Sequence, residues 1–259
     1  MKTKIVWSLT VLFVLSFALA GSSWAEKGYY IEEVLTSPPM FGQEAKEETV
    51  KTWILGTDMM RKDTKNGAES IIFRIDKGML WIVSHAEKSY IEMTMEQFQS
   101  LASIGMAMFG KTSETGEFEV PEIIFKRTGR TKKIGKWDCY EVDVQGQGLM
   151  GAKSTQWIGT NTGFDTDIYV RIFKLTFGNN VPPEFHKLFE KMTTELDGYP
   201  VQTVTSINFG EQKYETTQTL IKLEKTAIES SRFDVPAGYT KRTPPPGVLP
   251  GMGDKKTGK

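Results

Sequence analysis

The sequence has few of the side chains that enzymes most often use. It contains one cysteine, Cys139, and two histidines, His85 and His186, in 259 residues. A single cysteine cannot form an intramolecular disulfide, so the fold must be stabilised by its core. A lone cysteine among strand residues is more often a small buried side chain than a nucleophile. The histidines are far apart in sequence, and neither has a partner at metal-ligand spacing.

Recognisable catalytic motifs are also missing. The sequence has no Gly-x-Ser-x-Gly turn of the kind that presents a serine nucleophile. The glycine-rich stretch GQGLMG at 146–151 lacks the Lys and Ser or Thr that a phosphate-binding loop requires. We therefore predict that the protein is not an enzyme, with no cofactor and no metal. An unrecognised activity that uses Cys139 with a distant histidine is a third and weaker hypothesis.

An excess of charge of either sign is absent as well. The chain has 32 basic and 32 acidic residues, with a formal net charge of +0. This balance argues against nucleic acid as a partner, because nucleic acid requires a clustered basic face. It also argues against a polybasic attachment to anionic lipid.

The one long hydrophobic run lies at the N-terminus. Two lysines precede the apolar run IVWSLTVLFVLSFALA, and small residues follow it. This order is typical of a secretory signal peptide, and the run is short for a membrane-spanning helix. Cleavage fits after Ala20 or Ala25, and we favour Ala25. We predict a signal peptide at 1–25, a periplasmic location with secretion as the alternative, and no stable membrane insertion after cleavage.

Most of the remaining chain alternates apolar and polar residues with the period of a half-buried strand. Asn66-Gly67 is a strong signal for a hairpin, because both residues accept a positive φ. Residues 47–93 therefore read as a meander of five strands. Further strands are predicted at 29–36, 122–128, 137–144, 155–159, 201–209 and 214–223.

Helical spacing occurs in two places. Residues 95–109 place apolar side chains on one broad stripe, and Thr94 fits an N-cap. The segment 182–196 starts with prolines and then has apolar residues at helical intervals, whereas 165–175 fits either a helix or a strand. This order predicts an α+β fold, with a strongly curved antiparallel sheet and helices in its hollow. We predict one domain at 26–242 and a disordered Pro, Gly and Lys tail at 243–259.

Methionine and aromatic residues concentrate between 59 and 108. Methionine adapts to irregular contents and is common where a surface accepts varied partners, although it more often fills gaps in a core. The predicted helix at 95–109 carries no charge except Glu96, so its polar face is weak. The strand at 79–83 has bulky side chains on both faces, so a helix or a ligand must cover one of them.

Six stretches together resemble a known family. They are DMMRKD, IIFRIDKGMLWIVSHAEKSYIEM, the Met-rich helix, TKKIGKWDCYEVDV, DGYPVQTV and RFDVPAGY. Over residues 29–240 the chain resembles an uncharacterised family of exported bacterial proteins, which is similar to the LolA and LolB-like carriers. The resemblance implies an incomplete antiparallel barrel whose hollow is covered by a helical lid. In those carriers the hollow holds lipoprotein acyl chains, and an arginine matched here by Arg61 bonds to the lid backbone.

Our leading hypothesis is a periplasmic binding or carrier protein for a hydrophobic ligand, which would be a lipid or a lipoprotein acyl chain. The ligand would lie between the sheet and the helical lid. The candidate contacts are Met59, Arg61, Phe73, Trp81, Tyr90, Met95, Phe98, Leu101 and Met108. The alternative is a non-enzymatic envelope interaction or structural protein with a self-filled core. Neither hypothesis requires a particular oligomeric state.

Overall fold

The computed structural model describes residues 26–39, 44–109, 111–112, 118–119, 123–146, 153–177, 183–209 and 212–243. The predicted signal peptide at 1–25 lies outside the described residues. The predicted tail at 243–259 also lies outside them, except for its first residue.

One twelve-stranded sheet forms the body of the protein, in the order β14-β6-β5-β4-β3-β2-β1-β13-β12-β11-β10-β9. Neighbouring strands are antiparallel, except that β14 runs parallel to β6. The strands are β1 (Glu26–Ser37), β2 (Lys46–Leu55), β3 (Met59–Thr64), β4 (Glu69–Arg74), β5 (Met79–Ser84), β6 (Ser89–Thr94), β9 (Ile123–Ile134), β10 (Trp137–Gly146), β11 (Lys153–Gly159), β12 (Tyr199–Phe209), β13 (Gln212–Ile228) and β14 (Thr240–Arg242). A separate pair, β7 (Lys111–Thr112) and β8 (Phe118–Glu119), is antiparallel.

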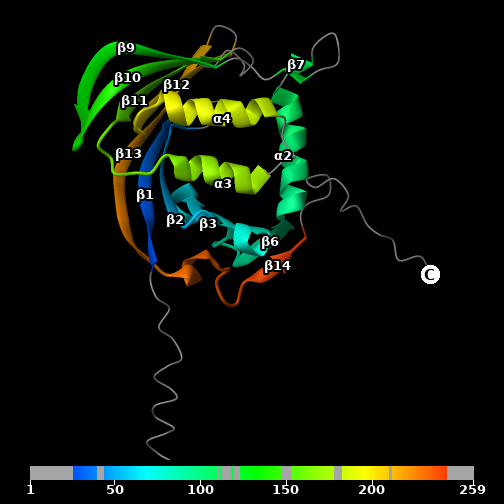
Figure 1. Ribbon diagram of the computed structural model, residues 1–259. Helices are drawn as coiled ribbons and strands as arrows, with labels where there is room; N and C mark the ends of the chain where they lie inside the picture. The colour runs from blue at the N-terminus through cyan, green and yellow to red at the C-terminus, as the bar shows by residue number, and fades with distance from the viewer. Residues whose placement is uncertain are drawn as a thin grey trace, which may run out of the picture.

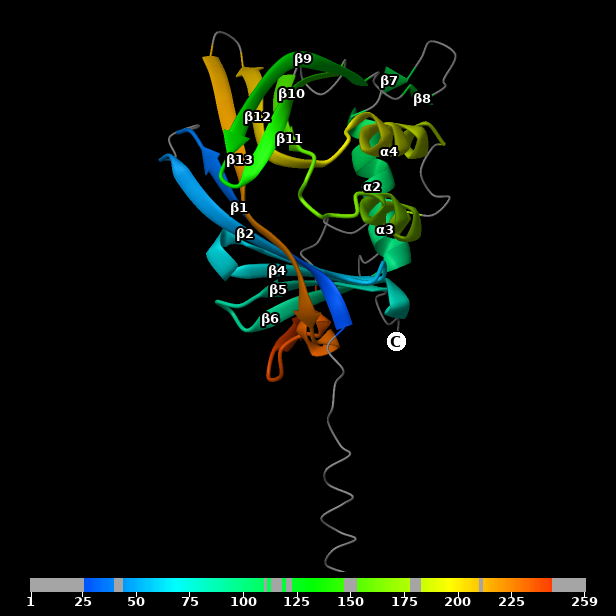
Figure 2. The ribbon, with the colours of Figure 1, turned by 60° about the vertical axis from the view of Figure 1, so that its left-hand side comes forward.

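Three helices lie in the hollow of this curved sheet. They are α2 (Met95–Phe109), α3 (Asp167–Phe177) and α4 (Pro183–Glu195). Figures 1 and 2 show α3 and α4 side by side across the open side of the sheet, with α2 crossing their ends. The predicted fold, an open and curved antiparallel sheet with helices over its hollow, is confirmed.

The first strand lies in the middle of the sheet, beside the last long strand. Strand β1 lies between β2 and the long strand β13, and it pairs with both over most of its length. The register with β13 shifts between Glu32 and Glu33, where the ladder has a bulge. Strands β2 to β6 form the predicted five-stranded meander on one side of this junction.

Local sequence signals explain the turns and the start of α2. Lys65, Asn66 and Gly67 have φ values of 50°, 54° and 87°, so the predicted Asn-Gly turn uses the left-handed conformation that these residues accept. They form the short helix η1 (Lys65–Gly67) between β3 and β4. At α2, the Gln97 amide donates to Thr94 Oγ1 at 3.2 Å, and the Thr94 amide donates to Gln97 Oε1 at 2.9 Å. The predicted N-cap is therefore one half of a capping box.

Each face of the sheet carries a buried cluster, and different elements cover the two clusters. The face toward α3, called the inner face, carries a cluster that includes Tyr29, Ile54 and Val201 with Ile172 of α3. The opposite, outer face carries a cluster centred on Phe233, which is 0% exposed. Phe233 belongs to η3 (Ser230–Phe233). Residues 229–243, called the C-terminal segment, thus cover the part of the outer face around Leu55, Ile72 and Val83.

Candidate functional site

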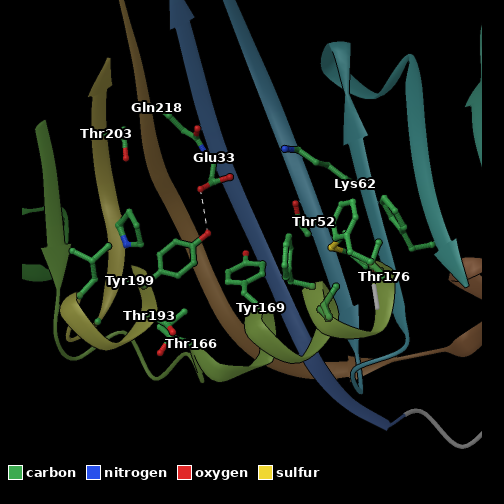
Figure 3. Close-up of a pocket in the computed structure, with 18 of the residues that line it drawn as sticks. Glu33, Thr52, Lys62, Thr166, Tyr169, Thr176, Thr193, Tyr199, Thr203 and Gln218 are labelled. Atoms are coloured by element: carbon green, nitrogen blue, oxygen red, sulfur yellow. Dashed lines mark hydrogen bonds between the residues drawn. The ribbon is translucent and has the colours of Figure 1, made fainter. Parts of the chain in front are cut away.

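A cavity of about 480 Å³ lies between the inner face and the helices (Figure 3). This volume is within the range of about 300–1,000 Å³ that is usual for small-molecule sites. It is lined by Glu33, Thr52, Met60, Lys62, Phe73, Phe98, Thr166, Tyr169, Ile172, Phe173, Thr176, Phe177, Thr193, Leu196, Gly198, Tyr199, Pro200, Thr203 and Gln218.

The helices form an apolar wall of this cavity. Helix α3 contributes Tyr169, Ile172, Phe173 and Phe177, which helical periodicity places on one face. Helix α2 contributes Phe98, whose ring centroid lies 5.6 Å from that of Phe73 on β4 and 5.7 Å from that of Phe177. Edge-to-face and tilted rings at these distances attract one another, so α2, α3 and the sheet are joined by aromatic contacts at the cavity.

The sheet contributes a row of polar side chains to the same cavity. Thr52 on β2 and Lys62 on β3 are cross-strand partners, and Thr203 on β12 and Gln218 on β13 are another such pair. Glu33 on β1 lies between the two pairs, because the strand order is β3-β2-β1-β13-β12. Figure 3 shows the row crossing the strands above α3. Buried polar side chains require hydrogen-bond partners, and most of this face is apolar. The row is therefore the part of the inner face that could bind polar groups of a ligand.

Glu33 is the most buried charge of the row, at 8% exposed. Tyr199 Oη donates a hydrogen bond of 3.2 Å to Glu33 Oε1, shown as the dashed line in Figure 3. Burial raises the pKa of the Tyr199 phenol well above its usual value, and the neighbouring Tyr169 and Glu33 add to the effect. Burial likewise raises the pKa of Tyr169 to about 12. Both phenols therefore keep their protons at neutral pH, and Tyr199 acts as a donor.

A buried hydroxyl of the lining has no hydrogen-bond partner among the described residues. Thr176 on α3 is 4% exposed, and its Oγ1 makes no hydrogen bond. Its backbone carbonyl accepts a hydrogen bond of 2.6 Å from Gln99 Nε2, which ties α3 to α2. An unpartnered buried hydroxyl costs free energy, so it is retained only where something offsets the cost.

The structure brings only part of the predicted site together. Phe73 and Phe98 line the cavity. Met95 and Leu101 pack in the adjoining cluster around Leu80, which α2 covers. The side chain of Met108 lies outside the described residues.

The other four predicted contacts lie on the outer face, which corrects their expected place in the hollow. Met59, Trp81 and Tyr90 pack against the cluster around Phe233. Alternation along β3 explains the error, because Met60 and Lys62 face the cavity and so Met59 and Arg61 face away. The α3 residues of the wall were missed because residues 165–175 fit two types of element, although their spacing of three and four was the available signal.

Arg61 also differs from the role that the resemblance implied. Its guanidinium donates to Asp63 Oδ1 at 2.7 Å, to Ser70 Oγ at 3.1 Å and to the Arg232 carbonyl at 3.1 Å. The backbone that it holds therefore belongs to η3 on the outer face and not to a lid helix.

The alternative hypothesis required a fully self-filled core, but the structure has a cavity between the sheet and the helices.

In the described part of the chain, no group of three or more His, Cys, Asp or Glu residues could hold a metal ion. Cys139 is buried at 3% exposed, and burial raises the pKa of its thiol.

Among the described residues, no helix combines the length and the apolar character needed to cross a membrane.

Comparisons with known proteins give one family and distant structural matches. Among solved structures, a LolA superfamily protein from Nitrosomonas europaea matches with 8% identity and a TM-score of 0.31, over 80% of this chain and 90% of that chain. A putative outer membrane lipoprotein-sorting protein domain from Vibrio parahaemolyticus matches with 10% identity and a TM-score of 0.29, over 87% of this chain and 95% of that chain. No curated protein matches the sequence.

These two structures are of the type named by the resemblance in sequence, but at such TM-scores they carry no argument about function. A family model described as a domain of unknown function, DUF4412, matches residues 40–239, which is most of the chain. The chain therefore belongs to the DUF4412 family.

Proposed function

We propose that this protein binds and carries a hydrophobic ligand, such as a lipid or a lipoprotein acyl chain, in the cavity between the inner face and the helices. The observation that supports the proposal most directly is the cavity of about 480 Å³ with an aromatic wall from α2 and α3. Each buried methylene would contribute about 0.8 kcal/mol, so a chain of about ten methylenes offers about 8 kcal/mol before the costs of binding.

The location is part of the same proposal. A periplasmic carrier would reach the envelope through the predicted signal peptide at 1–25, which lies outside the described residues. Mass spectrometry of the protein recovered from a periplasmic extract would identify its first residue. Recovery of the chain with its hydrophobic run still attached would contradict this part of the proposal.

Binding is tested by placing a large side chain in the cavity. The Thr176→Phe substitution puts a ring where Thr176 lines the cavity, whereas Leu175→Phe puts the same ring at a neighbouring position that is 49% exposed. The mature protein, purified without detergent, is titrated with a fluorescent dansyl-labelled fatty acid. We expect Thr176→Phe to weaken probe binding about tenfold or more and Leu175→Phe to leave it unchanged.

A second variant covers the case in which Thr176→Phe fails to fold. Phe98→Ala removes an aromatic side chain of the wall, and we expect it to weaken probe binding several-fold while circular dichroism still shows the native sheet. A wild-type protein that does not bind the probe, and whose native mass spectrum shows no copurified lipid, would rule out the carrier.

A further inference from the structure

Lys62 is the feature of the cavity that a purely apolar ligand does not explain. Its amino group belongs to the polar row, yet within the described residues it has no ion pair and no hydrogen bond. The neighbouring Arg61 on the outer face, in contrast, donates hydrogen bonds to Asp63, Ser70 and the Arg232 carbonyl. A cation that faces a cavity without a partner is available to an anion that enters the cavity.

Two hydroxyl groups of the cavity lining are also available. Thr52 is its cross-strand partner, is 7% exposed and makes no hydrogen bond through its side chain among the described residues. Thr176 Oγ1, from the opposite wall, is the buried hydroxyl without a partner. Figure 3 shows Thr52 beside the Lys62 side chain on the sheet, and Thr176 on the helix side of the cavity. One cation and two hydroxyl groups thus line the cavity from β3, β2 and α3.

The row also carries a negative charge, Glu33 on β1, which is two strands from the strand of Lys62. Figure 3 shows the Lys62 side chain extended toward Glu33, whose carboxylate accepts the hydrogen bond from Tyr199. An anionic group is attracted by Lys62 and repelled by Glu33, so the two charges together would set the orientation of a charged ligand.

We propose that the ligand is a single-chain amphiphile with an anionic headgroup, either a carboxylate or a phosphate. The headgroup binds Lys62 and Thr52 on the sheet, and the chain lies along Tyr169, Ile172 and Phe173 of α3. This inference rests on the proposed function, because it requires that the cavity holds a hydrophobic chain.

The test compares three ligands with the same chain, namely dodecanoate, dodecyl phosphate and dodecanol. Each is measured by displacement of a neutral polarity-sensitive probe from the full mature protein. We expect at least one of the two anions to bind about tenfold more tightly than dodecanol, which is the effect of one charge-assisted contact. Whether dodecanoate or dodecyl phosphate is preferred identifies the headgroup as a carboxylate or a phosphate.

Variants of the row assign the preference to Lys62. Lys62→Met is expected to remove most of the preference for the anion while dodecanol binds as before, and Lys62→Arg is expected to retain it. Lys27→Met, at an exposed position at the start of β1, is the matched control and should change nothing. Glu33→Gln is expected to leave anion binding intact or to tighten it, since it removes a like charge.

The failures of the two proposals differ. If dodecanol binds the wild type as tightly as both anions, or if Lys62→Met weakens all three ligands equally, the headgroup site is wrong while the carrier stands. If none of the three ligands displaces the probe from the wild type, the headgroup site and the carrier both fail.

Discussion

His85 and Ser70 form a contact on the outer face that looks catalytic at first sight. The Ser70 hydroxyl lies 2.6 Å from His85 Nε2, and His85 Nδ1 lies 2.9 Å from Tyr239 Oη. However, Ser70 is 0% exposed, and it donates its proton to Asp63 Oδ1 at 2.6 Å. The serine is thus neither accessible nor oriented for attack on a substrate. The contact instead connects β4 to Tyr239 in the C-terminal segment.

This contact predicts a pH dependence of stability. Burial lowers the pKa of His85, and the charge of Arg61 lowers it further. A histidine whose folded pKa is depressed contributes stability above its unfolded pKa of about 6.5, and the contribution is lost as the pH falls below that value. We expect the free energy of unfolding, measured by urea denaturation, to decrease between about pH 7.5 and about pH 5.

The His85→Gln variant isolates the effect, because glutamine does not titrate. Its loss of stability over the same pH range should be smaller than that of the wild type. His186→Gln, which leaves the outer face unchanged, should behave like the wild type. Identical pH profiles for the wild type and His85→Gln would show that His85 does not contribute.

At the scale of elements, the capping box of α2 is the clearest local interaction that fixes the start of a helix. Thr94 and Gln97 each satisfy a backbone amide of the other. Loss of an N-cap costs about 0.5–2 kcal/mol, so Thr94→Ala should lower the free energy of unfolding by about 1 kcal/mol. Denaturation in urea measures this directly. Thr94→Ser keeps the hydroxyl and should stay within a few tenths of a kcal/mol of the wild type; a Ser variant as unstable as the Ala variant would contradict the assignment.

Elements with strong local signals were the ones that the sequence predicted well. The strands of the 47–93 meander, the Asn66-Gly67 turn and the helix at 95–109 all depend on patterns within a few residues. For α3 the sequence fits both a helix and a strand, because eleven residues are few for a periodic signal to separate the two. The short strand β14 was not predicted at all, since a three-residue strand is formed by its pairing with β6.

The orientation of the strands was harder to predict than their existence. A strand with large residues on both faces does not itself tell which face meets the helices. On β5, Leu80 faces α2 while Trp81 and Val83 face the C-terminal segment. The predicted site therefore included Trp81 and missed Lys62 and Glu33. The covering of the outer face by residues 229–243 is a contact between distant parts of the chain, which periodicity does not encode.

At the scale of the whole molecule, the single cysteine reports on global unfolding. Cys139 belongs to the cluster that joins β1, β2, β10, β12 and β13 with α3. Its thiol is buried, and its raised pKa lowers the thiolate fraction further. We expect a thiol reagent such as DTNB to react with the native protein only at the rate of global opening, and to react rapidly in concentrated urea.

The same labelling can test ligand binding. A ligand that binds only the folded protein should slow the reaction in proportion to its occupancy, because it stabilises the native state. A reaction with the native protein as rapid as with the unfolded chain would mean that the cluster around Cys139 opens locally.

The position of β1 has a consequence for how the chain is made. Strand β1 pairs with β2 on one side and with β13 on the other, and β13 ends at Ile228. The hydrogen bonds between β1 and β13 therefore form only after most of the described chain has been synthesised. Until then the edge of β1 is unpaired in any nascent sheet, and unpaired edges invite aggregation. A chain that stops before Gln212 would keep this edge open permanently. Nonsense mutations before the codon for Gln212 are therefore expected to yield insoluble protein instead of a smaller folded one.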